Sequence, residues 1–149
     1  MDMISAPSSA GLIRRIGALL YDWLLIIAIW FLQTALLLPF THGEALPQEG
    51  LVHWLYVAML YLTALGFFLF FWRKNGQTLG MRAWQLRLVD AQGATPAWPD
   101  LVRRALWAIP SWGLGGLGVL WLYVDPSRRA WQDRFSHTRV VVEKRERNT

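Results

Sequence analysis

Asp22 is the residue best placed to do chemistry in this chain, because it lies inside a long apolar run. The stretch 16–38 holds 23 residues and this one formal charge. A carboxylate at the centre of a membrane helix costs about 3 kcal/mol, so it persists where it faces a partner or a water-filled cavity. Such a group can bind a cation or relay a proton. The pattern therefore predicts an ion-binding or proton-relay site at Asp22.

A polar stripe runs along the same apolar segment. Arg15 lies seven residues before Asp22, which places both side chains within about 20° on one helix face, and the stripe continues to Gln33. The two charges are about 10 Å apart along the helix axis, and the Arg side chain leans toward the N-terminus, away from Asp22. We therefore expect each charge to have a partner elsewhere in the chain.

Three later charged residues are candidate partners. We expect Arg103 or Arg104 to neutralise Asp22, and Asp133 to bind Arg15. Hydrogen bonds between ionised groups are stronger than those between neutral groups, so these contacts would fix the helices relative to one another. The simpler alternative for Asp133 is a helix cap or a surface ion pair.

Two apolar runs predict transmembrane helices. Residues 16–38 would form a helix of about 35 Å, enough to cross a bilayer core with some tilt. Residues 51–72 contain no charged side chain and carry aromatic residues at both ends, which is typical of an interfacial belt: Trp54, Tyr56, Phe71 and Trp72. The chain is therefore expected to be a multi-pass protein of a cell membrane.

The charges that flank these runs predict their orientation. Arg14 precedes the first run and Arg73 and Lys74 follow the second, whereas the loop 39–50 has Glu44 and Glu49 but no Lys or Arg. The positive-inside rule places both flanks in the cytoplasm and the loop outside. This predicts a bacterial cytoplasmic membrane protein with both termini in the cytoplasm.

A third apolar run, 105–124, leaves two alternatives open. Pro110 and four glycines interrupt its middle. From residue 125 onward the tail has seven Lys or Arg and four acidic residues, so it is basic. A re-entrant helical hairpin keeps this tail in the cytoplasm, as the positive-inside rule favours. A third transmembrane helix would use the glycines as a packing face.

The fold expected from these patterns is an all-α membrane protein with a small cytoplasmic two-stranded β element. The segment 84–90 alternates apolar and polar residues and 138–143 is β-branched, so we expect the two to pair. The whole chain, 1–149, is expected to form a single domain with a core over about 11–142. The ends 1–10 and 144–149 are expected to be flexible.

Composition argues against several classes of function. The chain has no Cys, and its three histidines do not converge by spacing, so no metal site is expected. No arrangement of Ser, His and acid suggests an enzyme, and no cofactor is implied. The net charge of +5 is interpreted as attraction to the anionic headgroups of a lipid bilayer and not to nucleic acid, because the basic residues flank apolar segments.

Four motifs, in order, resemble the RDD family of small membrane proteins, which is named for one arginine and two aspartates. The motifs read RRIGALLYD, NGQTLGMRAWQLRLVDAQG, VRRALW and WQDRFSHTRVVV. The resemblance identifies the arginine as Arg15 and the aspartates as Asp22 and Asp133. It implies a membrane architecture and, as suggested for the family, transport of an unidentified ligand.

The resemblance also covers a GxTxG element formed by Gly76, Thr78 and Gly80. Taken alone, this stretch imitates a phosphate-binding loop, but it lacks the Gly-Lys-Ser/Thr ending, so we expect a tight turn. Departures from the family pattern at 81–82 and 135–137 leave the three charged residues in place.

Two functions therefore remain. The first is a transporter or transport accessory in which Asp22 binds a cation or proton and Arg15 and Asp133 gate access from the cytoplasm. Two or three spans can hardly enclose a pathway, so this function requires a homo-oligomer or a membrane-protein partner. The second is a non-transporting membrane scaffold or assembly partner in which the charges only fix helix packing.

Overall fold

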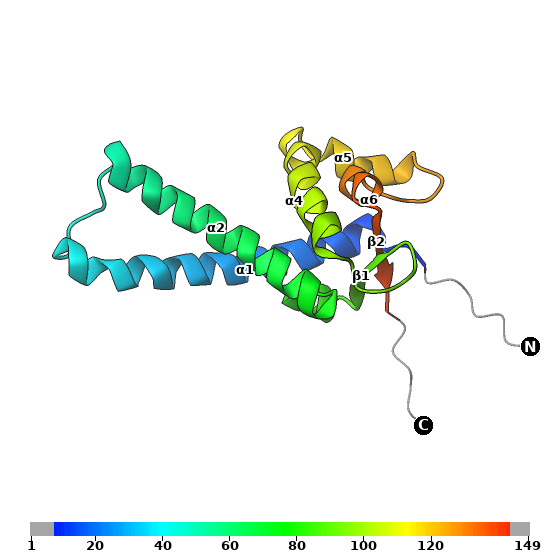
Figure 1. Cartoon of the computed structure of the whole chain (residues 1–149), viewed down its shortest axis with the longest axis horizontal. Coiled ribbons are helices and arrows are strands. Elements are labelled where there is room, and N and C mark those ends of the chain that lie inside the picture. The colour runs from blue at the N-terminus through cyan, green and yellow to red at the C-terminus, as the bar shows by residue number, and fades with distance from the viewer. Residues whose placement is uncertain (1–7, 144–149) are drawn as a thin grey trace, which may run out of the picture.

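Two long helices form a hairpin, and the elements that follow it in the chain pack at its open end (Figure 1). The computed structural model describes residues 8–143, so the predicted flexible end 144–149 and residues 1–7 of the predicted flexible start lie outside the described residues. In chain order the elements are α1 (Leu12–Leu37), η1 (Leu38–Thr41), α2 (Gly50–Asn75), α3 (Leu79–Ala83), β1 (Leu86–Asp90), α4 (Trp98–Gly113), α5 (Leu117–Leu120), η2 (Trp121–Tyr123), α6 (Trp131–Phe135) and β2 (Thr138–Val142).

Both helices of the hairpin are candidate membrane spans, as the sequence predicts. The segments Leu12–Thr41 and Gly50–Asn75 are long and apolar enough, and only 6% of the most apolar window of each is buried within the protein. Hydrogen bonds join the two helices near the C-terminal end of α1, from the Trp30 indole to the Leu60 carbonyl at 3.0 Å and between the Thr34 and Tyr56 hydroxyls at 2.8 Å. An apolar hairpin with so much exposed surface requires lipid or another protein around it.

The predicted strand pair is present as the antiparallel sheet β1–β2. Leu86 lies opposite Val142 and Leu88 opposite Val140, so the alternation read from the sequence sets the register. Leu86, Leu88 and Val140 are buried in the core between the sheet, the start of α1 and α4. The sheet thereby attaches the end of the described chain to the base of the hairpin.

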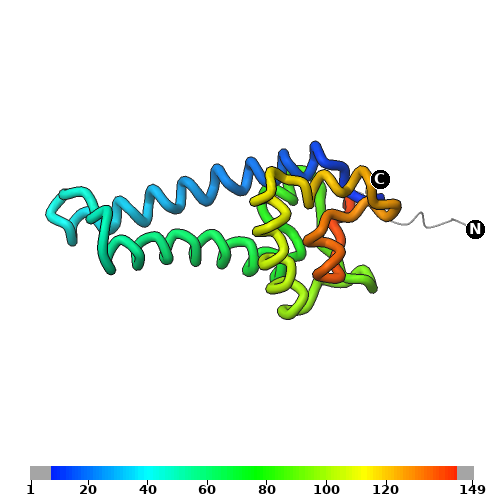
Figure 2. The backbone as a smooth tube through the Cα atoms, turned by 90° about the horizontal axis from the view of Figure 1, so that it is seen from above, coloured from blue at the N-terminus to red at the C-terminus, as the bar shows by residue number. Residues whose placement is uncertain are grey.

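The third apolar run forms a bent pair of helices. Its first half belongs to α4, which begins at Trp98, earlier than the predicted run. The chain breaks at 114–116, and Gly116 adopts φ +80°, so that the next helical piece leaves at 103°. Figures 1 and 2 both show α4 crossing the long axis of the hairpin. The bend fits either a re-entrant loop or a broken span.

Residues 8–10 lie against the sheet, although the sequence places them in a flexible end. The Ala10 N–H donates to the Val140 carbonyl and the Val142 N–H donates to the Ser8 carbonyl, both at 3.0 Å. Ala10 is fully buried. The edge of β2 thus offers these residues backbone hydrogen bonds, and the flexibility expected for 1–10 stays a prediction.

Candidate functional site

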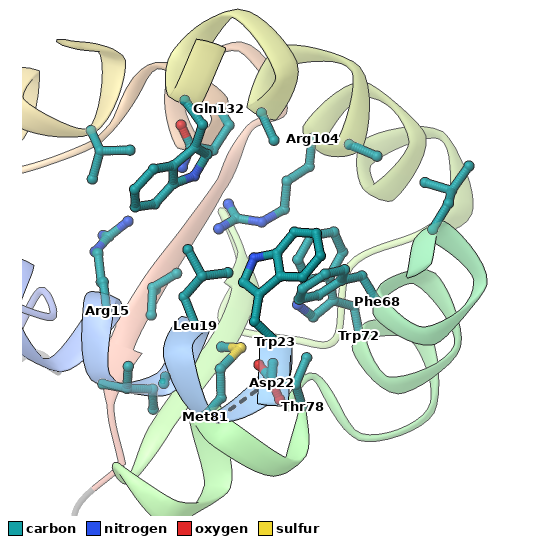
Figure 3. Close-up of a pocket in the computed structure, with 18 of the residues that line it drawn as sticks. Arg15, Leu19, Asp22, Trp23, Phe68, Trp72, Thr78, Met81, Arg104 and Gln132 are labelled. Carbon is teal, nitrogen blue, oxygen red and sulfur yellow. Dashed lines mark hydrogen bonds between the residues drawn. The ribbon is translucent and has the colours of Figure 1, made fainter. Parts of the chain in front are cut away.

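A cavity of about 400 Å³ lies at the base of the hairpin, where the helices α1 to α6 meet the two strands. Most of its wall is apolar. Five polar side chains also line it, namely Arg15, Asp22, Thr78, Arg104 and Gln132. Figure 3 shows the two arginines entering from opposite walls, with Asp22 beside Thr78 at the other end. Its size and its few convergent polar groups are typical of a small-ligand site.

Asp22 is held at the start of the short helix α3. Its Oδ2 accepts a hydrogen bond from the Thr78 hydroxyl at 2.5 Å, and its Oδ1 accepts one from the Gly80 N–H at 2.8 Å. The Thr78 hydroxyl also caps α3 by accepting from the Met81 N–H at 3.1 Å. A carboxylate suits this position because the first N–H groups of a helix have no partner within the helix.

Close packing of α3 on α1 depends on Gly80. A Cβ atom added there would overlap the Ala18 carbonyl and lie 2.9 Å from Asp22 Cγ. The turn before α3 uses Gly76, which ends α2 in the left-handed conformation at φ +66°. The GxTxG element thus forms the predicted tight turn, and its three residues bring α3 against Asp22.

Asp133 accepts hydrogen bonds from two buried arginines. Its Oδ2 lies 2.6 Å from Arg15 Nη1 and its Oδ1 lies 2.5 Å from Arg104 Nη1. It also accepts a hydrogen bond from the Ala130 N–H at 3.2 Å, and Arg104 donates to the Thr138 hydroxyl at 3.2 Å. We call Arg15, Arg104 and Asp133 the charge cluster. The contact expected between Arg15 and Asp133 is therefore present.

The charge cluster sets the protonation of its carboxylate. Burial alone would raise the pKa of Asp133, but the positive charges of Arg15 and Arg104 outweigh it and hold that pKa below its ordinary value. Asp133 is therefore ionised at neutral pH. Buried pairs of this kind stabilise little overall, but removal of one partner costs about 3–5 kcal/mol because a charge is left alone.

The expectation that Arg103 or Arg104 neutralises Asp22 is wrong. Arg104 lies on the buried face of α4 and binds Asp133, whereas Arg103 is on the exposed face with its Nη1 3.7 Å from Asp100 Oδ1. Among residues 8–143, Asp22 makes no ion pair with Lys, Arg or His. Its carboxylate is bonded only to neutral donors.

Gln33 lies away from the cavity, in the middle of the hairpin. Its Nε2 donates to the Thr63 hydroxyl of α2 at 2.8 Å, and its Oε1 is buried without a hydrogen-bond partner. The polar stripe read from the sequence therefore continues into the hairpin. No group of three or more His, Cys, Asp or Glu placed to hold a metal ion occurs within residues 8–143.

Within residues 8–143, three buried N–H groups around the cavity have no partner: Arg15 Nη2, Arg104 Nε and Trp72 Nε1. The Arg104 guanidinium lies over the Trp72 ring, 5.1 Å from its centroid. A buried donor without a partner costs about 1–3 kcal/mol, so three at one cavity need an explanation.

The sequence does not single out Trp72, Ser111 or Gln132 as site residues. Trp72 was placed in the interfacial belt, but only 9% of it is exposed, because the end of α2 is covered by α4. Ser111 donates to Gln132 Oε1 at 2.5 Å and so joins α4 to α6. The spacing of Leu101, Arg104 and Ser111, three and seven residues apart, is a helical stripe that could have indicated the buried face of α4.

The apolar hairpin, with a polar site buried at its base, defines an integral membrane protein. The RDD family model matches residues 9–137, most of the chain. The chain therefore belongs to the RDD family. Comparison with curated proteins and with solved structures gives no match.

Proposed function

We propose that this protein is a small membrane transporter or transport accessory, with the cavity at the base of the hairpin as its ligand site. One observation supports this most. Three buried charged side chains, two from α1 and one from α4, line a single cavity, and one of them, Asp22, lacks a cationic partner within residues 8–143. Ionisable groups within membrane segments are expensive and commonly mark ion or substrate pathways.

In this proposal Asp22 binds a proton or cation and the charge cluster controls access from the cytoplasm. The carboxylate can change its charge without breaking an ion pair, because only Thr78 and Gly80 donate to it. Gln33 extends the path into the hairpin, where its free Oε1 offers an acceptor. No enzymatic step is involved. A single hairpin cannot enclose a path, so a homo-oligomer or a membrane-protein partner completes it.

The proposed orientation puts the open end of the hairpin in the cytoplasm of a bacterial cell. Arg14, Arg73 and Lys74 lie at that end, near anionic headgroups, and Glu44 lies in the loop at the tip. Because α4 crosses the hairpin axis, this orientation would lay it along the membrane surface, in place of a re-entrant loop or a broken span, with exposed apolar side chains such as Ile109 facing lipid.

Ion flux through the purified protein tests the proposal. The full chain is reconstituted in liposomes that contain a pH-sensitive dye, and proton movement is driven by a potassium diffusion potential of either sign. Asp22→Asn should abolish the flux, whereas Asp100→Asn, which alters only a partly exposed ion pair on α4, should retain it. Absence of flux from the parent protein, or normal flux from Asp22→Asn, contradicts transport through Asp22.

A membrane scaffold is the second candidate, and one observation favours it. Both oxygens of Asp22 already accept hydrogen bonds, and these bonds fasten α3 to α1. In a scaffold, Asp22→Asn would lower thermal stability and weaken assembly with a partner, and the parent protein would carry no flux. Measuring flux and stability on the same samples separates the two functions.

A further inference from the structure

We propose that the cavity binds the anionic head of an amphiphile, a phosphate or carboxylate group with an apolar chain. This inference rests on the proposed function in one respect, since it takes the same cavity as the ligand site; the anion binds beside the arginines, and the proton or cation of that proposal binds at Asp22 at the other end. It does not depend on transport itself.

The first support is the set of unpartnered donors. Three buried N–H groups find no acceptor among the described residues, and all three side chains line the cavity: Arg15 Nη2, Arg104 Nε and Trp72 Nε1. Each of these side chains is more than nine-tenths buried. Three donors without acceptors indicate a ligand that brings acceptor oxygens.

The second support is the charge at this end of the cavity. Arg15 and Arg104 carry two positive charges and Asp133 carries one negative charge, which leaves a net charge of +1 in the charge cluster. Asp22 does not cancel it locally, because its two oxygens are bonded to Thr78 and Gly80 at the other end. An anion next to the arginines would balance the charge cluster.

The third support is the apolar rim. Ile109 and Trp112 of α4 and Leu65 of α2 line the cavity and are also exposed on the outer surface, by 70%, 39% and 42%. These residues lie on elements whose exposed apolar side chains would face lipid in a membrane. The charged donors are deep and the apolar residues form the opening, so the head of the ligand enters first and its chain extends toward the bilayer.

Binding to the full chain in a neutral detergent tests this inference. Two anionic probes, oleate and dioleoyl phosphatidic acid, are compared by thermophoresis with their uncharged counterparts, oleyl alcohol and dioleoylglycerol, and with inorganic phosphate. Saturable binding of either anionic probe, at least tenfold tighter than its uncharged counterpart, is expected. The anionic probe that binds identifies the source of the head group. Equal affinity for charged and uncharged probes overturns the inference, and tight binding of inorganic phosphate alone overturns the need for a chain.

The variant Trp72→Phe removes one donor and keeps the aromatic ring under Arg104. Trp72 Nε1 has no partner among the described residues, so this variant breaks no hydrogen bond within them. The smaller ring loses part of the packing against Phe68, so a modest fall in thermal stability is expected without ligand, and it is measured before binding is compared. It should bind the anionic probe about tenfold more weakly, the effect of losing one hydrogen bond to a charged group. Trp54→Phe, at the exposed far end of α2, is the matched control and should bind like the parent.

An unchanged affinity of Trp72→Phe overturns the site. A second variant, Ala108→Phe, fills the cavity without altering any charge and should also prevent binding. Binding without proton flux leaves this site in place and contradicts the proposed transport, whereas flux without binding contradicts this site alone.

Discussion

Replacing Asp133 with Asn should be among the most damaging single changes to this protein. The carboxylate is fully buried and is the only acidic group in contact with both Arg15 and Arg104 within residues 8–143. In Asp133→Asn one amide oxygen can still accept from one arginine, but the amide NH₂ then faces the N–H groups of the other. The net charge of the charge cluster rises from +1 to +2 in a buried site.

The magnitude follows from this charge count. Leaving buried charges without a counterion costs about 3–5 kcal/mol. Arg15→Met instead leaves Arg104 and Asp133 as a neutral pair, so its cost is the lost hydrogen bond to a charged group, about 1.5–3 kcal/mol. The double variant, Arg15→Met with Asp133→Asn, restores a net charge of +1. Its free energy of unfolding should be at least about 1 kcal/mol higher than the sum of the two single-variant losses predicts. The lost bond from Arg15 Nε to the Ala10 carbonyl is common to both Arg15 variants and cancels in the cycle.

Thermal unfolding in detergent, followed by the fluorescence of the ten tryptophans, measures these differences. A destabilisation of 3–5 kcal/mol corresponds to a fall in Tm of about 6–20 °C for a chain of this size. The reasoning is refuted if Asp133→Asn is no less stable than Arg15→Met. It is also refuted if the cycle is additive within about 0.5 kcal/mol, as for independent sites.

The stabilising effect of Asp133 should depend on pH. The pKa of Asp133 is held below its ordinary value of 3.8, so its ionised form stabilises the fold above about pH 4. That contribution is lost as the pH falls through the lower pKa of the folded state. The difference in Tm between the parent and Asp133→Asn should therefore stay constant from pH 7 to about 4 and shrink below that. A difference that already shrinks above pH 5 contradicts the assignment.

Two further predictions concern packing and orientation. Gly80→Ala should destabilise by about 1–3 kcal/mol, because its Cβ would overlap the Ala18 carbonyl, whereas Gly66→Ala meets no atom within 4 Å and should be near neutral in the same unfolding assay. In this Cys-free chain, Glu44→Cys should react with a membrane-impermeant thiol reagent in intact cells and Ser127→Cys only after lysis; the opposite pattern would contradict the cytoplasmic placement of the open end.

The sequence predicts the hairpin and the sheet because both depend on local patterns. Two uninterrupted apolar runs of membrane-crossing length are sufficient for α1 and α2, and the alternation around Leu86 and Leu88 is sufficient for β1. The contact of Arg15 with Asp133 was expected from the resemblance and from the need of a buried charge for a partner.

The partner of Asp22 was assigned wrongly because charge alone was used to choose it. Neutral donors at the start of α3 satisfy that carboxylate, and a hydroxyl and a backbone N–H leave little trace in a sequence. The cavity was not predicted either, since its wall combines side chains from six helices and both strands. The neighbouring residues Arg103 and Arg104 lie on different faces of α4. In the sequence, only their position relative to the stripe that contains Leu101 indicates that Arg104 is the buried one.

The contact of Ala10 with Val140 has a consequence for the synthesis of the protein. During translation Asp133, the counterion of Arg15, is made 118 residues after Arg15. At 5–20 residues per second, this interval is roughly 10 s. Throughout it, α1 lacks the carboxylate that Arg15 binds in the folded structure, and the backbone next to it lacks the strand with which it pairs. The start of α1 therefore reaches its final contacts only after nearly all of the described chain has been made.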